Sequence, residues 1–583
     1  MNRLALFLIS LSLTACSSLG NSSNQTTAVT QAKATGMVVT ANPHASKAGA
    51  DILRAGGSAV DAAIAIEAVL SLVEPQSSGL GGGAFMVHFD NKSKEVMVYD
   101  GRETAPAKAT AKMFLKDDGE SIGFLNAKNS GVSTGVPGVI AMLALAHADH
   151  GKLPWGAHFE RAKQLAVDGF EVSPRLNSLI ERFGKYIPDS VDEGPVDAHG
   201  YLFNEAGEPL KVGAIITNPA YAATLTEIAK SPESFYQGEI AEQIVAQTSQ
   251  TPRAGSLSLQ DMANYKALKR PALCAPYRGK TLCGPPPASS WVAVGEIAGL
   301  LEHGPAFSGL GAADPQNWAI FTQAQRLAYA DRDQYVGDSQ FVDVPLKGLL
   351  NSDYLTKRAK LIDTDLASEA VVPGDPWVYE QVKKVVYGSD ATNDVAGTTH
   401  FVVVDGDGNV VSMTASVESI FGSTRMAGGM FLNNQLTDFS FQPVDDNGKP
   451  IANRVEPRKR PRSSMSPTIV LDQDGEFLMA TGSPGGNSII AYTAKTLVGV
   501  LDWNLSPQQA VELPNLVARR GKVRIEKERA APELIDGLRK YGFNVDESAG
   551  ENSGLSVILR KADGTLEGGV DPRREGVIEV IEF

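Results

Sequence analysis

The 583-residue sequence is poor in cysteine. It contains only Cys16, Cys274 and Cys283, and the last two are nine residues apart. Two cysteines at this spacing provide neither the number nor the arrangement of ligands that a zinc site requires. The sequence therefore predicts no cysteine-based metal centre.

Positive charge is also in deficit. Lysine and arginine total 53 against 67 aspartates and glutamates, which gives a net charge of −14 at pH 7. A chain this acidic is a poor partner for nucleic acid or anionic lipid through its overall charge. With 43% hydrophobic and 21% charged residues, the composition is close to the globular average, which excludes disorder, collagen or a coiled coil as the main state.

The N-terminus lacks an apolar run long enough to cross a bilayer. The run from Leu4 to Leu13 is too short for a mature spanning helix, and it fits the central part of an export signal. It ends in Leu-Thr-Ala-Cys, which resembles a bacterial lipoprotein signal cut before Cys16. Because Cys16 sits where that motif needs it, we expect residues 1–15 to be removed and Cys16 to be lipidated. Ser17 follows rather than aspartate, so the protein would be periplasmic, anchored at the outer membrane of a Gram-negative cell; the alternative is ordinary secretion with an unmodified cysteine.

The rest of the chain mixes helical and strand patterns without βαβ repeats, which indicates an α+β fold. Residues 16–35, rich in serine, threonine, asparagine and glutamine, predict a flexible tether. Ala45–Leu72 has helical periodicity, and the middle, about 140–390, is expected to be mainly helical. Strands are expected at Ala84–Phe89, Thr399–Asp405, Val410–Ser416, Thr468–Leu471, Phe477–Thr481 and Leu555–Leu559. A hairpin turn is expected at 406–409, between the second and third of these strands.

Export bears on the two remaining cysteines, because an exported protein can oxidise them. Cys274 and Cys283 flank Pro276–Lys280, which can form a turn between paired strands. We therefore expect a disulfide, with two separate buried thiols as the alternative.

Three short motifs are rejected as functional sites. Gly79–Ala84 matches a dinucleotide-binding fingerprint, but it follows a helix and precedes a strand, the reverse of the required order. Gly131–Gly135 matches a serine-hydrolase nucleophile elbow, yet the residues before it are polar rather than a buried strand. His147 and His150 lie three apart on an expected helix; without a third ligand they indicate a solvated face.

The segment that begins at Gly397 and Thr398 carries potential chemistry. Here a threonine stands where irregular sequence meets a strong strand. Its hydroxyl is a weak nucleophile unless a base activates it, and the free amine of an N-terminal threonine, with a pKa of about 7.7–8, can be that base. This requires cleavage between Gly397 and Thr398, where glycine offers little bulk to an attack on its carbonyl. Taken alone, such a segment is more often a plain strand.

Several ordered motifs change that interpretation. They are Ser78–Gly83, Asp100–Pro106, Pro285–Pro287, Thr398–His400, Leu432–Ser440, Lys459–Thr468 and Thr481–Gly486. Together they resemble the gamma-glutamyltranspeptidase family, also called glutathione hydrolases, over most of the chain after about residue 35. The resemblance implies a four-layer αββα N-terminal-nucleophile hydrolase fold. It also implies self-cleavage into a large subunit, 36–397, and a small subunit, 398–583, which form a heterodimer.

The resemblance assigns catalytic roles by position. It implies that Thr398 is the nucleophile and that Ser416 is the hydroxyl residue supporting it. The backbone N–H groups of Gly485 and Gly486 would form the oxyanion hole. Thr398 would attack the γ-amide of glutathione or a related donor, and the γ-glutamyl ester would pass to water or to an amino acid or peptide. This chemistry needs no metal and no organic cofactor.

Substrate-binding residues are implied in the same way. Arg102 would hold the donor α-carboxylate, which suits a guanidinium fork. Asp438 would hold the α-ammonium group, with Gln435 beside it, and Ser463 and Ser464 would bind the carboxylate end. Each residue alone has a simpler explanation: a surface salt bridge, a turn, or a helix cap.

Three features depart from the family pattern. Glu418, expected to touch the donor, stands where many members have asparagine. Trp291 adds bulk near the expected acceptor side. The segment Gln442–Pro457, which can cover the site, has no aromatic residue, so we expect hydrolysis to outweigh transfer.

Other functions remain open. The same fold could serve a glutaryl or cephalosporin acylase or a poly-γ-glutamate transpeptidase, and a non-catalytic binding lipoprotein is the alternative from another class. Asp438 argues against an acylase for substrates that lack the α-amine, because its carboxylate would then be unpaired.

Overall fold

A buried hairpin carries Thr398. Strands β9 (Gly397–Val404) and β10 (Val410–Glu418) run antiparallel, and every residue in both is buried. The turn between them is held by Asp405, whose carboxylate accepts the N–H groups of Asp407 at 3.0 Å and Asn409 at 2.9 Å. Because both faces are covered, the strands carry the valine-rich runs that make this hairpin visible in the sequence.

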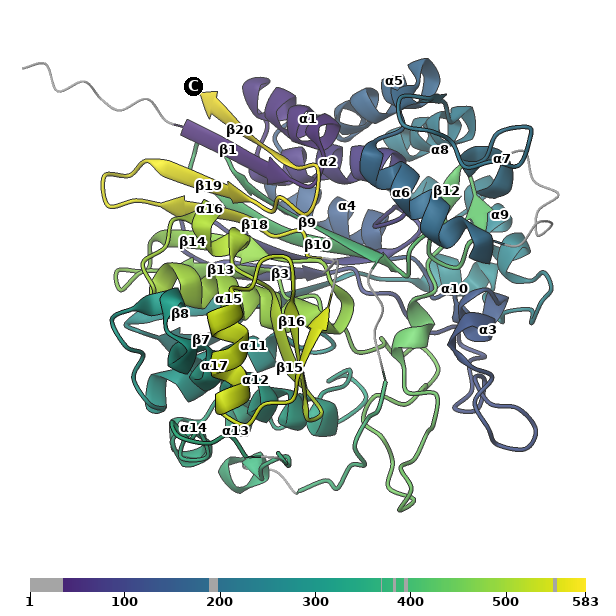
Figure 1. Cartoon of the computed structure of the whole chain (residues 1–583). Coiled ribbons are helices and arrows are strands. Elements are labelled where there is room, and N and C mark those ends of the chain that lie inside the picture. Colours follow the sequence, from purple (N-terminus) through teal and green to yellow (C-terminus); the bar gives the residue numbers. More distant parts are fainter. Residues whose placement is uncertain (1–34, 188–197, 369, 381–383, 393–396, 549–552) are drawn as a thin grey trace, which may run out of the picture. The chain divides into compact units, whose positions relative to one another are not determined.

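The computed structural model describes residues 35–187, 198–368, 370–380, 384–392, 397–548 and 553–583 (Figure 1). The expected signal segment 1–15, Cys16 and the tether up to residue 34 lie outside the described residues. Thr35, which we expected in the tether, instead begins strand β1. In the described part of the chain, none of the helices combines the length and apolar character needed to cross a bilayer.

The hairpin belongs to a seven-stranded sheet with the order β20-β1-β9-β10-β2-β3-β6. Strand β1 lies between β20 and β9 and pairs antiparallel with both, so the two ends of the described chain close the sheet beside the hairpin. The further strands are β1 (Thr35–Thr40), β2 (Gly83–Phe89), β3 (Val96–Asp100), β6 (Leu268–Pro271) and β20 (Val577–Glu582).

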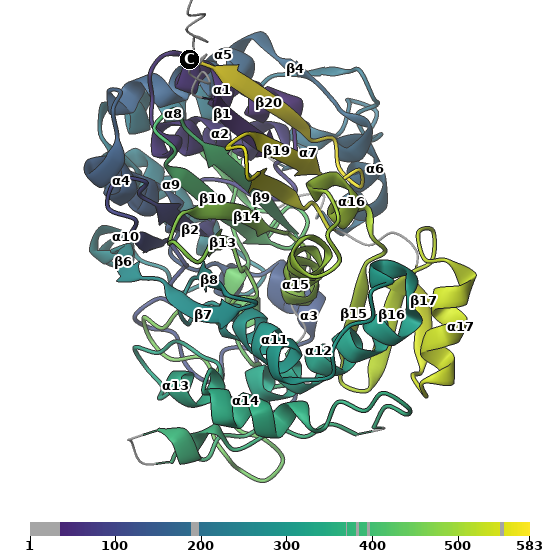
Figure 2. The ribbon, with the colours of Figure 1, turned by 90° about the vertical axis from the view of Figure 1, so that its left-hand side faces the viewer.

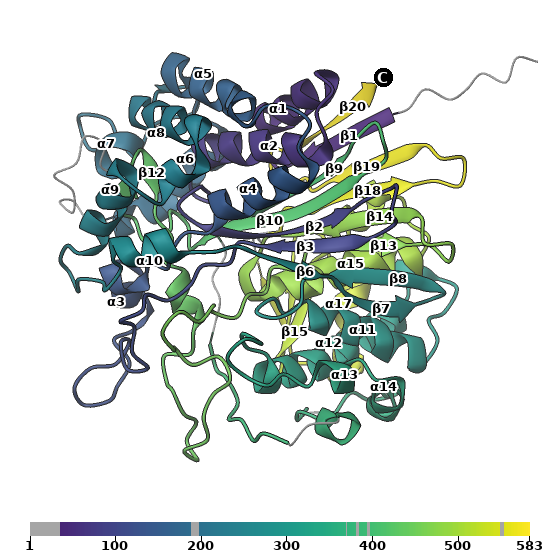
Figure 3. The same ribbon diagram turned by 180° about the vertical axis from the view of Figure 1, so that it is seen from behind.

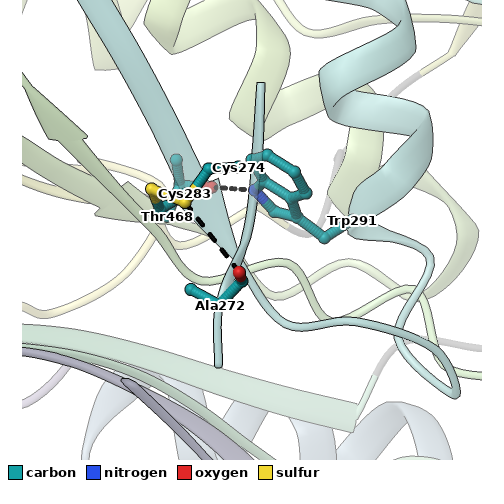
Figure 4. The surroundings of a disulfide bond; sticks show 5 residues. All are labelled: Ala272, Cys274, Cys283, Trp291 and Thr468. Carbon is teal, nitrogen blue, oxygen red and sulfur yellow. Dashed lines mark hydrogen bonds between the residues drawn. A yellow bond between two sulfur atoms is a disulfide. The ribbon is translucent and has the colours of Figure 1, made fainter. Parts of the chain in front are cut away.

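A second sheet of six strands has the order β19-β18-β14-β13-β8-β7. Its strands are β7 (Leu273–Tyr277), β8 (Lys280–Gly284), β13 (Thr468–Leu471), β14 (Phe477–Gly482), β18 (Ser556–Arg560) and β19 (Leu566–Val570). Cys274 and Cys283 face each other across β7 and β8 and form a disulfide (Figure 4). Residues 140–390 are mainly helical in the described part of the chain, as expected, with β6 to β8 as short strands among the helices.

The two sheets pack face to face. Met37, Val87 and Val402 of the first sheet share one buried apolar cluster with Ile469 and Ile558 of the second. Burying alternate residues of both sheets against each other removes apolar surface from water, worth about 25 cal/mol per Å². This contact fixes the seven-stranded sheet over the loops that follow β14.

Helices cover the two outer faces, so the layers run helices, sheet, sheet, helices (Figure 3). On the outer side of the first sheet, α1 (Pro43–Arg54), α2 (Ala59–Val73) and α4 (Val139–His150) contact its strands, and α5 (Glu160–Asp168), α6 (Pro174–Phe183), α8 (Pro219–Lys230) and α9 (Glu239–Thr248) belong to the same buried cluster. On the outer side of the second, α11 (Trp291–His303) and α15 (Ile489–Leu501) contact its strands, α12 (Pro315–Tyr335) and α14 (Ser352–Ala359) pack on α11, and α17 (Pro532–Lys540) packs on α12. Helix α2 is buried along its whole length, which explains its apolar character on all sides.

Smaller elements complete the described chain. A three-stranded sheet, β15 (Leu516–Arg519), β16 (Lys522–Glu526) and β17 (Val545–Ser548), lies beside α17 (Figure 2). Short helices are α3 (Phe124–Lys128), α7 (Ala198–Leu202), α10 (Leu259–Asn264), α13 (Leu346–Leu349) and α16 (Pro507–Glu512). Two-residue strands are β4 (Phe170–Glu171), β5 (Ile215–Ile216), β11 (Met426–Ala427) and β12 (Met430–Phe431).

Candidate active site

Thr398 lies near the start of β9, directly opposite Ser416 of β10. The Ser416 hydroxyl donates to the Gly397 carbonyl oxygen at 2.8 Å, and its oxygen lies 3.1 Å from the Thr398 hydroxyl oxygen. A hydroxyl has one proton, so the bond between the two side chains runs from Thr398 to Ser416. Ser416 thus contacts both the candidate nucleophile and the carbonyl of the Gly397–Thr398 peptide bond.

Gly397 is required at this position by close packing. A Cβ atom placed on it would lie 2.4 Å from the carbonyl group of Ser419 and 2.5 Å from the carbonyl oxygen of Glu418. A bulge between Ser416 and Glu418 shifts the register of β10 here. Any larger residue would therefore push the hairpin apart next to Thr398.

A small pocket of about 20 Å³ opens beside Thr398. All of its lining residues follow Gly397 in the sequence: three come from the β9–β10 hairpin, and the others from the segments between β12 and β13 and between β14 and α15, and from the first residue of α15. Its lining consists of Thr398, Ser416, Glu418, Gln435, Asp438, Ser463, Ser464, Met465, Gly486 and Ile489. Most of the residues singled out from the sequence therefore meet at one place.

Asp438 and Arg102 contact each other. One Arg102 guanidinium nitrogen donates to the Asp438 carboxylate, and Gln435 donates to the same oxygen at 3.1 Å. Arg102 is fully buried and also donates to the carbonyl oxygens of Pro461 and Arg462, both at 3.1 Å. Arg102 thus stands one side chain away from the pocket, behind Asp438.

The second carboxylate beside Arg102 contributes little negative charge. Burial raises the pKa of Glu103 to about 8, although the Arg102 charge acts in the opposite direction. Glu103 is therefore mostly protonated at pH 7. Asp438 is the neighbour that balances the Arg102 charge, which leaves an ion pair with one carboxylate facing the pocket.

The two serines are held by a loop and by an arginine. The backbone of Ser463 pairs with the loop that precedes α11: its N–H donates to Ala288 at 2.9 Å, and its carbonyl accepts from Ser290 at 2.7 Å. Arg332 of α12 donates to the Ser464 hydroxyl at 2.7 Å and to the Ser290 hydroxyl at 3.1 Å. Arginine can only donate, so the Ser464 hydroxyl accepts this bond and keeps its own proton for another acceptor.

Gly485 and Gly486 follow β14 and precede α15. Their φ angles are 137° and 56°, in the region that favours glycine. Gly486 and Ile489, the first residue of the 13-residue helix α15, both line the pocket. The N-terminus of a helix favours negative charge, so this edge of the pocket suits a developing oxyanion.

Glu418 lines the pocket in a strained backbone conformation with φ of 80°. Its carboxylate accepts from the Ser419 hydroxyl at 2.5 Å and from the Asn434 amide. Nearby, burial lowers the pKa of Lys128 to about 8, an effect that the Glu418 charge partly offsets. The pocket therefore presents two carboxylates, Glu418 and Asp438.

Other sequence expectations have different outcomes. Trp291 is fully buried and donates to Thr468 at 3.0 Å (Figure 4), so the expectation that it adds bulk to an acceptor site is wrong. Ser133 of the rejected elbow motif is buried and donates to the carbonyls of Lys128 and Ser130, a structural role. Arg332 was missed because it lies 132 residues from Ser464 inside a helix with no local signal.

Comparison with known proteins decides the family. A family model described as Gamma-glutamyltranspeptidase matches residues 45–581. The chain belongs to this family.

Relatives in the transpeptidase family match over nearly the whole chain. The glutathione hydrolase proenzyme of Escherichia coli (strain K12) is 36% identical over 551 residues, which cover 92% of this chain and 90% of that protein. The glutathione hydrolase proenzyme of Bacillus subtilis (strain 168) is 34% identical over 555 residues, 93% and 90% of the two chains.

Solved structures show the same mixed α+β fold. A cephalosporin acylase from Bacillus halodurans superposes with a TM-score of 0.80 at 27% identity, covering 94% of this chain and 96% of that one. The gamma-glutamyltranspeptidase of Helicobacter pylori has a TM-score of 0.54 at 28% identity, covering 59% of this chain and 96% of that one. The fold alone therefore does not choose between a γ-glutamyl donor and another acyl group.

Proposed function

We propose that this protein hydrolyses and transfers γ-glutamyl groups of glutathione and related donors, with Thr398 as an N-terminal nucleophile. The observation that carries this proposal is the contact of Ser416 with both the Thr398 hydroxyl and the Gly397 carbonyl, at the edge of a pocket that contains Asp438. Membership of the transpeptidase family, and relatives that are glutathione hydrolase proenzymes, supports it.

Maturation begins at the Gly397–Thr398 bond. The Thr398 hydroxyl oxygen attacks the Gly397 carbonyl carbon while Ser416 donates to the carbonyl oxygen. The C–N bond then breaks, which converts the amide into an ester and frees the Thr398 amine. Water hydrolyses the ester, so residue 397 ends a large subunit and Thr398 begins a small one, and the two subunits stay together as a heterodimer.

Turnover uses the amine released by this step. The amine takes the hydroxyl proton as Thr398 attacks the γ-amide carbon of the donor, and the proton passes to the leaving amine. The N–H groups of Gly485 and Gly486 and the N-terminus of α15 stabilise the oxyanion, an interaction worth about 2.7–4 kcal/mol per donor in other enzymes. Water or an amino acid or peptide then accepts the γ-glutamyl group from Thr398.

Donor recognition follows from the charges around the pocket. Asp438 and Glu418 attract the α-ammonium group of the donor, and Ser463 and Ser464 donate to its α-carboxylate. Arg102 adds positive charge from behind Asp438, within reach of the same carboxylate after a small shift. Two carboxylates in one small pocket favour a donor that carries a cationic group, which argues against a glutaryl acylase.

A poly-γ-glutamate transpeptidase remains the second candidate, because its donor is also linked through γ-amides and carries an α-carboxylate on every residue, with a free α-ammonium group on the first. A pocket of about 570 Å³ is lined by residues that neighbour Asp438 in the sequence. They include Thr437, Phe441 and Val444 and the carboxylates of Asp445 and Asp446. Those acidic groups repel a polyanionic chain, which favours small donors such as glutathione.

The proposed location follows the N-terminal sequence. The protein is exported, loses residues 1–15 and carries a lipid on Cys16 that anchors it in the periplasm at the outer membrane. The Cys274–Cys283 disulfide supports an oxidising compartment. Globomycin, an inhibitor of lipoprotein signal cleavage, tests this: accumulation of an uncut form that keeps its signal is expected, and no change in mass would contradict it.

Intact mass under denaturing conditions tests the function. Wild-type protein should give two chains split between Gly397 and Thr398, whereas Thr398→Ala should remain one chain. The processed protein should release glutamate from glutathione. A folded wild-type chain that stays whole would lack the catalytic amine and would favour a non-catalytic binding protein.

A further inference from the structure

Two histidines and one aspartate form a cluster far from the candidate active site. Asp61 lies in the first turn of α2, His147 in the last turn of α4, and His158 in the short 3-10 helix Trp155–Phe159. One potential ligand atom of each residue lies within 4.8 Å of the other two. The Ala59 N–H, at the start of helix α2, donates to the Asp405 carboxylate. Asp405 follows the end of β9 that is farther from Thr398, and the two residues are roughly 24 Å apart along the strand.

Asp61 is held in place by the backbone. Its Oδ2 atom accepts three backbone N–H groups, from Ser58 at 2.9 Å, Lys152 at 2.8 Å and Leu153 at 3.2 Å. The carboxylate is fully buried, with Oδ2 occupied by these donors and Oδ1 lying 3.1 Å from His158 Nε2 and 3.6 Å from His147 Nε2.

Three other polar atoms of the cluster lack hydrogen bonds. Among the residues that the structure describes, Asp61 Oδ1 and both ring nitrogens of His158 are buried without a hydrogen-bond partner. His158 Nε2 lies 3.1 Å from Asp61 Oδ1, yet the ring N–H direction misses the oxygen. The lone pair of an unprotonated Nε2 has this same direction, so it points into the space beside the carboxylate.

We propose that Asp61, His147 and His158 bind one divalent transition-metal ion, with Zn²⁺ as the best match. Two imidazoles and one carboxylate are a common zinc ligand set. Ligand atoms of a tetrahedral zinc ion lie roughly 3.3 Å apart. The distances from Asp61 Oδ1 to His158 Nε2, 3.1 Å, and to His147 Nε2, 3.6 Å, fall on either side of this value.

His147 also provides the entrance. Its side chain retains 20% of its surface, whereas those of Asp61 and His158 are fully buried, so a water molecule can reach the fourth position from this side. His147 Nε2 lies 2.9 Å from the Leu153 carbonyl oxygen. Binding requires the His147 ring to turn away from Leu153, which breaks that hydrogen bond; the Nε2 proton moves to Nδ1, and the lone pair of Nε2 then faces the ion.

The ion would act on stability rather than on catalysis. It would join α2, α4 and the loop between Gly151 and Phe159, segments that the backbone bonds to Asp61 already hold together. A ligand that binds only the folded state stabilises it in proportion to the logarithm of its concentration over Kd. The sequence pattern pairs His147 with His150, whereas the fold pairs it with His158 and Asp61.

Zinc binding by the full chain tests this proposal. The metal-free protein is dialysed against micromolar ZnCl₂, and bound zinc per chain is measured by atomic emission. We expect one zinc per wild-type chain and a higher Tm with zinc than without it. The double variant His147→Gln/His158→Gln should bind zinc at least about 100-fold more weakly and lose the Tm shift, while γ-glutamyl turnover stays unchanged.

His150→Gln is the matched control. His150 lies on the same helix as His147, but it contacts Tyr99 at 2.8 Å and stacks on His88. This variant should bind zinc like the wild type. Equal zinc in wild type and double variant, or none in wild type, would overturn the proposal and leave an Asp61–His158 ion pair only. If the double variant does not fold, the single variant His147→Gln, at a partly exposed position, is compared with the wild type for bound zinc and for the Tm shift in the same way.

Discussion

Ser416→Ala should separate maturation from folding. Ser416 makes three contacts at the cleavage site: it donates to Gly397 at 2.8 Å, accepts from the Glu418 N–H at 2.9 Å, and lies 3.1 Å from the Thr398 hydroxyl. Alanine removes all three but leaves the strand geometry intact. Thr398 and Gly397 keep their positions, because both remain paired with the backbone of β10.

The magnitude follows from the bond to the scissile carbonyl. Loss of one donor to a developing oxyanion costs about 2.7–4 kcal/mol, which slows the step by about 100- to 1,000-fold. The Glu418 N–H also loses its acceptor, and an unpaired buried donor costs about 1–3 kcal/mol of folding stability. The variant should therefore fold with a lower Tm and persist for a long time as a single chain.

The assay is a time course of intact mass on freshly purified precursor. Ser416→Thr is the matched control, because it restores the hydroxyl and its β-branched side chain suits a strand. The Ser416→Thr variant should be cleaved at a rate near that of wild type, whereas the Ser416→Ala variant should not. Alanine processing as fast as threonine would refute the role of the Ser416 hydroxyl in maturation.

Three further perturbations test other parts of the site. Arg332→Met should raise the KM for glutathione about tenfold or more with kcat little changed, since a hydrogen bond to a charged group contributes about 1.5–3 kcal/mol; a fall in kcat alone would contradict this role. Asp438→Asn should reduce turnover of a γ-glutamyl anilide far more than that of the glutaryl anilide, which lacks the α-amine, and equal losses would remove the ammonium assignment. Burial lowers the pKa of His400 to about 3, so its neutral form stabilises the fold above the unfolded pKa of 6.5, and this contribution is lost as the pH falls toward 3, by about 1.4 kcal/mol per pH unit. His400→Asn should flatten the fall of Tm below pH 6.5, and an unchanged slope would count against this origin.

The balance between hydrolysis and transfer is a separate expectation from the sequence. Gln442–Pro457 carries no aromatic side chain, so we expect glycylglycine to accelerate donor turnover only weakly. A time course with and without glycylglycine checks this. Strong acceleration by the acceptor would show that transfer dominates.

The sequence predicts elements wherever the pattern is local. The β9–β10 hairpin, β13 and β14 have alternation or apolar runs, and the structure places them within a residue or two of the expected positions. Strands β7 and β8 match the paired strands expected on either side of the Pro276–Lys280 turn, within a mainly helical middle region. Strand β1 escapes prediction because it follows the polar N-terminal segment closely.

What the sequence determined by itself was the family and most of the residues that line the pocket, since these depend on ordered short motifs. The chemistry of Thr398 after Gly397 stays a prediction. Only the tertiary structure decided which of those residues touch. It joined Arg102 to Asp438 across 336 positions and brought Arg332 to Ser464. It also placed His158 and Asp61, rather than His150, beside His147. Such contacts arise when buried charges must find partners as two sheets and their helices pack together, and no local pattern records them.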